Sequence, residues 1–117
     1  MSEPYNKELI KKAKDIGRRL NIDLKEGVYF CATGPTFETR AEYRVVQILG
    51  ADVVGMSTVQ EVIVARHMNM NVFAMSVVTD IGTREEENVI THEEVLQAAK
   101  EAEPKFSKIF RELIASL

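Results

Sequence analysis

An aromatic ring, two carboxylates and a hydroxyl group lie in this chain where apolar segments end. Phe37 and Glu38 stand in a turn, Gly34-Pro-Thr-Phe-Glu-Thr39, that follows one apolar run, while Thr79 and Asp80 end another. An aromatic face next to a carboxylate suits a flat heterocycle with N–H groups, because the ring can stack and the carboxylate can accept hydrogen bonds. The alternative for Glu38 is a solvated acid in a surface loop, which is where most glutamates lie.

Met56 and Ser57 stand at the end of a further apolar segment, Ala51 to Met56. The carboxyl ends of parallel strands meet at one edge of a sheet, so these two residues are expected near Glu38 and Asp80. Such a set could hold a nucleoside, with Met56 under the sugar and the two acids on the base edge. Ser57 would then stand at a helix N-terminus, where an anion is favoured.

Several other chemistries lack the residues that they need. The glycine fingerprint of dinucleotide sites and the Gly-Lys-Ser/Thr ending of the Walker phosphate loop are both missing. His67 and His92 are too few, and too far from a pair of cysteines, to indicate zinc. A Ser57, Asp80 and His92 hydrolase remains a weaker alternative, because the segment around Ser57 lacks the second glycine of a nucleophile elbow.

The spacing of apolar residues predicts an α/β fold. Helices are expected over 6–20, 40–49 and 58–68, a further helix is expected after Thr91, and strands are expected over 28–32, 51–56 and 71–79. The strands are apolar on consecutive positions, which is typical of a parallel sheet covered by helices on both faces. The predicted order is βαβαβα, with residues 80–90 as a loop.

Three helix starts have the spacing of a capping box, in which two side chains satisfy backbone donors reciprocally. The pairs are Thr39 with Glu42, Thr58 with Glu61, and Thr91 with Glu94. Pro104 lies inside the last helical pattern, so a kink or a break is expected near Glu103.

The 117 residues are 45% hydrophobic and 28% charged, with a formal net charge of −3, which fits one domain over 1–117. The acidic balance gives no reason to expect nucleic acid, and the apolar runs are too short to span a membrane, so a cytoplasmic protein is expected. Cys31 is expected to be a buried, inert thiol. Three buried-type strands leave two open edges, which indicates part of a larger sheet and an oligomer.

The run GPTFETRAEYRVVQILGADVVGMSTVQEVIVARHMNMNVF, followed by VVTD and THEEVL, closely resembles the C-terminal half of the trimeric, low-molecular-mass purine nucleoside phosphorylases. The resemblance implies a three-layer α/β/α fold, of which this chain would form a βαβαβα half. It also implies phosphorolytic cleavage of purine nucleosides to the free base and ribose 1-phosphate, in a trimer. Orthophosphate would be a co-substrate, and no cofactor or metal is implied.

The same resemblance implies roles for individual residues. Glu38, Asp80 and His92 would be the catalytic residues: Glu38 would accept from the N1 edge of the purine, and His92 would reach the ribose 5′-hydroxyl. Thr79 and Asp80 would face N7 and the 6-substituent, where a hydrogen bond stabilises the negative charge of the leaving base. Phe37, Val54 and Met56 would line the base and sugar, and Ser57 would contact phosphate.

Three departures from the family pattern bear on function. Gln60 stands where proline is usual, and the loop from Asp80 to His92 is a couple of residues shorter than in animal relatives, which affects the placement of His92. Asp80 also stands where relatives that prefer 6-oxopurines usually carry asparagine. The N-terminal half, which supplies the glycine-rich phosphate loop, is expected to be absent, so the 117 residues alone should be inactive. A non-catalytic purine-binding or assembly fragment is the alternative function, and a nucleosidase that uses water is a weaker one.

Overall fold

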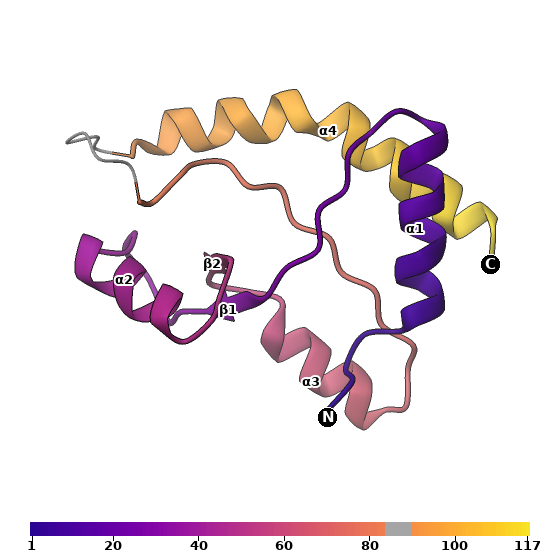
Figure 1. The fold of residues 1–117 in the computed structure, drawn as a ribbon, viewed down its shortest axis with the longest axis horizontal. Coiled ribbons are helices and arrows are strands. Elements are labelled where there is room, and N and C mark those ends of the chain that lie inside the picture. Colours follow the sequence, from indigo (N-terminus) through magenta and orange to yellow (C-terminus); the bar gives the residue numbers. More distant parts are fainter. Residues whose placement is uncertain (84–89) are drawn as a thin grey trace. The chain divides into compact units, whose positions relative to one another are not determined.

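The computed structural model describes residues 1–83 and 90–117, which contain four helices and a two-stranded sheet (Figure 1). The elements in chain order are α1 (Lys7–Arg19), β1 (Tyr29–Cys31), α2 (Arg40–Ile48), β2 (Val53–Gly55), α3 (Val59–His67) and α4 (His92–Ala115). This arrangement confirms the predicted α/β class. Among the described residues, none of the helices is both long and apolar enough to cross a membrane.

The described chain divides into two compact units. The first unit consists of residues 1–25, 58–77 and 102–117, and the second consists of residues 26–57 and 78–101. All eight residues proposed for the site belong to the second unit. The single domain expected over 1–117 stays a prediction.

The first unit has its core between α1 and the last turns of α4. Ala13 and Ile16 of α1 are buried with Ile109 and Leu113 of α4, and Ile109 has no exposed surface. The spacing of the α1 pair places both side chains on one face of the helix, as the sequence predicts. Burying four apolar side chains together is the main favourable contribution to this unit.

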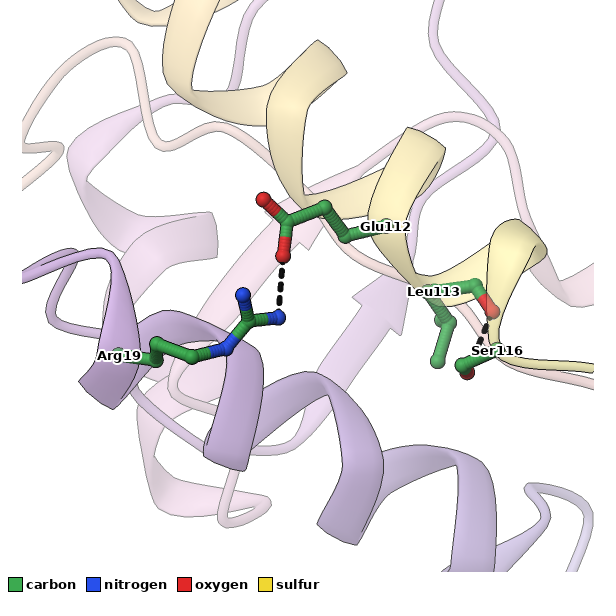
Figure 2. A network of polar contacts seen from close by, with 4 residues as sticks. All are labelled: Arg19, Glu112, Leu113 and Ser116. Carbon is green, nitrogen blue, oxygen red and sulfur yellow. Dashed lines mark hydrogen bonds and ion pairs between the residues drawn. The ribbon is translucent and has the colours of Figure 1, made fainter.

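A polar network lies beside this core (Figure 2). Arg19 at the end of α1 forms an ion pair with Glu112 of α4, and the hydroxyl of Ser116 donates to the carbonyl oxygen of Leu113 at 2.7 Å. Lys12 also donates to the carbonyl oxygen of Ser116 at 3.0 Å. The contacts of Arg19 and Lys12 join α1 to the C-terminal end of α4 at the surface.

The second unit contains the parallel pair β1 and β2, connected by α2. Tyr29 pairs with Val53, and Cys31 pairs with Gly55. The backbone N–H of Val28, just before β1, donates to the carboxylate of Asp52 at 2.7 Å. A side chain ahead of β2 therefore helps to set the register of the two strands.

Three helices end in the same way, with a residue of positive φ after the cap. These residues are Asn21 after α1, Gly50 after α2 and Asn69 after α3, with φ of 55°, 90° and 60°. Glycine and asparagine accept this left-handed conformation with little cost. The stop predicted at Gly50 is confirmed.

The third predicted strand, over 71–79, is wrong, because this segment carries no strand pairing in the described chain. Its backbone contact at Val72 is instead with the start of α1: the N–H of Asn6 donates to the carbonyl oxygen of Val72 at 2.8 Å. Phe73 and Met75 pack against the core of the first unit. The apolar pattern therefore predicted correctly that this segment packs against a core. A strand also requires a neighbouring strand with which to pair, and the pattern gives no information about that.

Two of the three predicted capping boxes are confirmed. At α2 the N–H of Thr39 donates to Glu42 at 2.6 Å, and the N–H of Glu42 donates to the Thr39 hydroxyl at 3.3 Å. Thr91 and Glu94 make the same two bonds at α4, at 3.2 and 3.3 Å. The box at Thr58 is wrong: its φ of 75° departs from the extended backbone that a capping residue needs, and its side chain makes no capping bond.

Two further expectations also need correction. The break near Glu103 does not occur, because α4 runs through Pro104 without interruption, while the alternative of a kink stays a prediction. Cys31 is half-buried rather than fully buried, since a two-stranded sheet leaves the edges of both strands uncovered. The predicted loop over 80–90 includes residues 84–89, which lie outside the described residues.

Candidate functional site

The turn after β1 places Phe37 and Glu38 next to the start of α2. Gly34 has a φ of 63° and is joined to Pro35 by a cis peptide bond. The capping box of Thr39 then fixes the first turn of the helix. Phe37 is 43% exposed, whereas Glu38 is half-buried, so the carboxylate is the more sheltered of the two groups.

Met56 lies against this turn from the end of β2. A Cβ atom on Gly34 would overlap the sulfur of Met56 and would come within 3.2 Å of its Cγ. The thioether therefore occupies the space that a side chain at position 34 would need. Both the positive φ and this close approach explain why glycine stands there.

Glu38 and Asp80 both lie near enough to Tyr43 for their charges to act on it. Burial, followed by the negative charges of Glu38 and Asp80, raises the pKa of Tyr43 to about 12. The tyrosine is protonated at neutral pH.

The ring of Tyr43 is fixed on its other side by the segment after Asp80. A Cβ atom on Gly82 would come within 2.7 Å of Cδ1 of the ring and closer still to Cε1 and Cζ. The absence of a side chain at Gly82 thus makes room for the phenol ring. The ring of Tyr43 therefore packs on the segment that follows Asp80.

Thr79 and Asp80 are themselves joined by a hydrogen bond. The hydroxyl of Thr79 donates to Oδ1 of Asp80 at 2.9 Å, and both residues are half-buried. This bond leaves Oδ2 of the carboxylate available for a further donor.

The end of β2 brings Val54, Met56 and Ser57 together in sequence order, with Val54 paired to Phe30. The N–H of Ser57 donates to the hydroxyl of Tyr29 at 3.4 Å. Ser57 lies on the surface immediately before the N-cap of α3. The hydroxyl of Tyr29 therefore determines the orientation of the peptide group that precedes this helix.

His92 is placed at the first residue of α4, where it is exposed. The chain that joins it to Asp80 includes residues 84–89, outside the described part. Its role at a ribose hydroxyl stays a prediction.

The cluster is suited to accepting hydrogen bonds. Two carboxylates with one phenol make the local potential negative, which favours ligand N–H groups and opposes a second anion at the same point. Within the described residues, no group of three or more His, Cys, Asp or Glu side chains is arranged to hold a metal ion.

Residues 1–115 of the chain match the sequence profile of the phosphorylase superfamily. The chain belongs to the phosphorylase superfamily. This membership confirms the predicted family resemblance.

Named relatives within the superfamily are purine nucleoside phosphorylases. The chain is 38% identical over 117 residues to purine nucleoside phosphorylase 1 of Geobacillus stearothermophilus, covering 100% of this chain and 43% of that protein. It is 43% identical over 121 residues to the Bos taurus enzyme, covering 100% of this chain and 42% of that protein. The chain thus spans about two fifths of the length of these relatives.

Solved structures of purine nucleoside phosphorylases are also similar to the structure of this chain. The Schistosoma mansoni purine nucleoside phosphorylase in complex with adenosine has a TM-score of 0.92 and 35% identity, covering 99% of this chain and 43% of that one. The complex of the Schistosoma mansoni enzyme with inosine gives a TM-score of 0.92 and 36% identity, over 99% and 42%. The fold class predicted from the sequence is confirmed by these structures.

Sequence reasoning missed two residues of this candidate site. Tyr43 lies on α2, five positions after Glu38, and its contact with Gly82 depends on a distant part of the chain. Tyr29 of β1 reaches Ser57 for the same kind of reason. A signal was present for Tyr29, because a polar tip inside an apolar strand needs a partner. No local pattern indicates the partner of Tyr43.

Proposed function

We propose that this chain is the purine- and ribose-binding part of a purine nucleoside phosphorylase. The observation that supports this most directly is that Glu38 and Asp80, far apart in the sequence, both lie near enough to Tyr43 for their charges to act on it, with the exposed ring of Phe37 next to Glu38 in the chain. The chain's membership of the phosphorylase superfamily makes a nucleoside base the expected ligand. The reaction is the transfer of a pentosyl group from the purine to orthophosphate.

In this proposal the base lies between Phe37 on one side and Val54 and Met56 on the other. Glu38 accepts a hydrogen bond from the N1 edge of a 6-oxopurine. Asp80, which Thr79 holds through Oδ1, uses its second oxygen to accept from N7–H of the departing base. His92 contacts the 5′-hydroxyl of the ribose.

Catalysis then follows from where charge develops. As the glycosidic bond breaks, its electron pair goes to the purine, which takes up a proton at N7 that the loss of a proton from hydrogen phosphate balances overall, and Asp80 accepts a hydrogen bond from this N7–H. N7 of the intact nucleoside carries no proton, so the contact forms only as the bond breaks and favours the transition state over the ground state. Orthophosphate attacks C1′ of the sugar, and free base and ribose 1-phosphate are the products.

The remaining parts of the proposal concern phosphate and assembly. Ser57, immediately before the N-cap of α3, contacts the orthophosphate, since helix N-termini favour anions. We propose no resident cofactor, a homotrimer, a cytoplasmic location and a role in purine salvage. No nucleic acid or membrane partner is proposed.

Ligand binding to the 117-residue chain tests the base site. Saturation-transfer NMR and calorimetry should detect hypoxanthine and guanine, while uracil, a smaller ring without the imidazole edge, serves as the control ligand. Glu38→Gln should raise the Kd for hypoxanthine about tenfold, because the ionised acceptor is lost. A chain that binds no purine, or binds uracil equally well, contradicts the proposed site.

A second proposal is that these residues bind purine without turning it over when they are studied alone. It is favoured by the coverage of relatives, of which the chain spans 42–43%. Phosphorolysis requires a positioned nucleophile, and Ser57 is the one proposed phosphate contact here. Phosphate-dependent release of hypoxanthine from inosine should be negligible for the 117-residue chain, and robust release would contradict this.

A further inference from the structure

We propose that Tyr29 is a positioning residue, which holds Met56 in place against the ribose of a bound purine nucleoside. This inference rests on the proposed function. It gives a role to a tyrosine of β1 that lies outside the predicted site residues. It also divides the site between two tasks, because the two acids recognise the base while the strand end that Tyr29 supports recognises the sugar.

The side chain of Tyr29 lies along the end of β2. Tyr29 pairs with Val53 in the parallel ladder, and its ring reaches two residues further, to Gly55. A Cβ atom on Gly55 would overlap the hydroxyl oxygen of Tyr29 and would come within 2.9 Å of Cζ and 3.3 Å of Cε2. The phenol therefore packs directly on the backbone of Gly55, where a residue with a side chain would keep it away.

The hydroxyl of Tyr29 also holds the chain on the other side of Met56. It accepts a hydrogen bond from the N–H of Ser57 at 3.4 Å. One phenol thus contacts the residue before Met56 and the residue after it. The next residue, Thr58, has a φ of 75°, a conformation that costs energy and persists only where surrounding contacts hold the backbone. The hydroxyl of Tyr29 provides such a contact one residue earlier.

The side chain of Met56 is held on one side and open on another. Its sulfur occupies the place where a side chain on Gly34 would stand, and its Cγ is 3.2 Å from that Cβ position. Met56 is nevertheless 48% exposed, so part of its surface remains available to a ligand. A methionine has several rotatable bonds, and its thioether presents a fixed surface only where its surroundings hold it. Tyr29 fixes the backbone of Met56, and Gly34 fixes the position of its sulfur.

The chemistry of this surface suits a sugar better than the edge of a base. A thioether is at most a weak acceptor, and its apolar surface matches the C–H groups of a ribose. The N–H groups of the base are assigned to the carboxylates of Glu38 and Asp80. A thioether that is ordered before the ligand arrives lowers the cost of binding. Tyr29 therefore contributes more to the affinity for a nucleoside than to the affinity for its free base.

The test compares inosine with hypoxanthine, which differ only in the ribose, on the 117-residue chain. Tyr29→Phe removes the hydroxyl but keeps the ring on Gly55, and thermal unfolding checks that the fold is retained. In calorimetry we expect the Kd for inosine to rise about three- to tenfold, with less than about a twofold rise for hypoxanthine. Tyr5→Phe, in the other unit, is the matched loss of a tyrosine hydroxyl and should change neither value.

A double-mutant cycle distinguishes the positioning of Met56 from a general structural effect. In a Met56→Ala background, Tyr29→Phe should change the Kd for inosine less than about twofold, because the side chain that it positions is gone. An unchanged Kd for inosine, equal losses in both backgrounds, or equal losses for the two ligands would overturn the inference while leaving the base site intact. Binding of hypoxanthine but not inosine by the wild-type chain would do the same. A wild-type chain that binds neither ligand overturns the proposed function, and this inference with it.

Hydrogen exchange of the wild-type chain tests the contact without a variant. Because Ser57 lies on the surface, its N–H is slowed in exchange only by the hydrogen bonds that it makes. We expect NMR to show exchange at least about tenfold slower than in an unstructured peptide, and faster exchange in Tyr29→Phe. Exchange of the wild-type Ser57 N–H at the rate of an unstructured peptide would overturn the inference, even if Tyr29→Phe failed to fold.

Discussion

The phenol ring of Tyr43 lies directly on the backbone of Gly82, so that a methyl group at position 82 would come within 2.7 Å of Cδ1 of the ring. That separation is well inside van der Waals contact between carbon atoms. Because Gly82 follows Asp80 by two positions, the packing of one ring determines where the second acid of the site can lie.

The first prediction concerns Gly82. Gly82→Ala should lower the free energy of unfolding by about 1–3 kcal/mol, because the ring or the backbone must move to admit the methyl group. Urea unfolding at pH 7 measures this loss. In a Tyr43→Ala background the same substitution should cost less than about 0.5 kcal/mol, since the obstructing ring is gone. Equal losses in the two backgrounds would show that the contact is not the cause.

The second prediction concerns the ionisation of Tyr43, whose pKa is raised from 10.0 to about 12 by burial and by Glu38 and Asp80. The unfolded tyrosine loses its proton near pH 10. The stability that protonated Tyr43 gives the folded state is therefore complete below pH 10 and is lost as the pH rises to about 12. Glu38→Gln should lower the pKa of Tyr43 toward 10 without reaching it, because burial remains. A ¹³C NMR titration of the tyrosine Cζ signals measures this, with Glu103→Gln as the control.

The third prediction concerns the capping box of α2. Thr39→Ala should cost about 1 kcal/mol at pH 7, because the hydroxyl that satisfies the N–H of Glu42 is lost. The bonds from Thr39 lower the pKa of Glu42 below 4.5. Their contribution is therefore present above pH 4.5 and is lost as the pH falls. The difference in urea midpoint between wild type and variant should shrink at pH 3, while Thr36→Ala should have little effect at either pH.

The fourth prediction concerns the core of the first unit. Ile109→Ala should lower the free energy of unfolding by about 2–5 kcal/mol, because Ile109 has no exposed surface and its removal leaves a cavity. Ile114→Ala, at a position 65% exposed on the same helix, should change it by less than about 0.5 kcal/mol. Comparable losses for the two variants in denaturant titrations would mean that α4 packs differently from the structure.

The fifth prediction concerns base preference at Asp80. An ionised carboxylate opposes O6 of hypoxanthine but accepts from the 6-amino group of adenine, whereas an amide can donate to O6. Asp80→Asn should widen the ratio of the adenine and hypoxanthine Kd values by roughly ten- to a hundredfold, at about 1–3 kcal/mol for each mismatched contact. An unchanged ratio, or one that moves toward adenine, would mean that Asp80 does not face the 6-position.

The sequence was sufficient for features that depend on neighbours along the chain. The α1 helix follows from apolar spacing, and the start of α2 follows from Thr39 and Glu42, three residues apart. The order of the site residues also follows, because a strand end, a turn and a capped helix are each encoded locally. The phosphorylase family could be identified for the same reason.

Features that depend on distant partners were not predictable in the same way. The strand over 71–79 was expected from its apolar pattern, but a pattern cannot show whether a neighbouring strand is present to pair with it. Thr58 has the right spacing for a cap, but its φ of 75° removes the geometry that capping needs. The ring of Tyr43 packs on Gly82, which lies 39 positions later in the sequence. Nothing in the sequence near either residue indicates that contact.

The core of the first unit also bears on how the chain can fold during its own synthesis. The hydrogen bond between Val28 and Asp52 beside the sheet joins residues 24 positions apart in the sequence. The ion pair of Arg19 with Glu112 joins residues 93 positions apart. The β1–α2–β2 segment can therefore assemble while the rest of the chain is still being translated. Ile109 and Leu113 are synthesised long after α1, so Ala13 and Ile16 stay without the side chains that bury them until then. A chaperone that shields apolar helix faces would accordingly find its target in α1 until Ile109 and Leu113 have been synthesised.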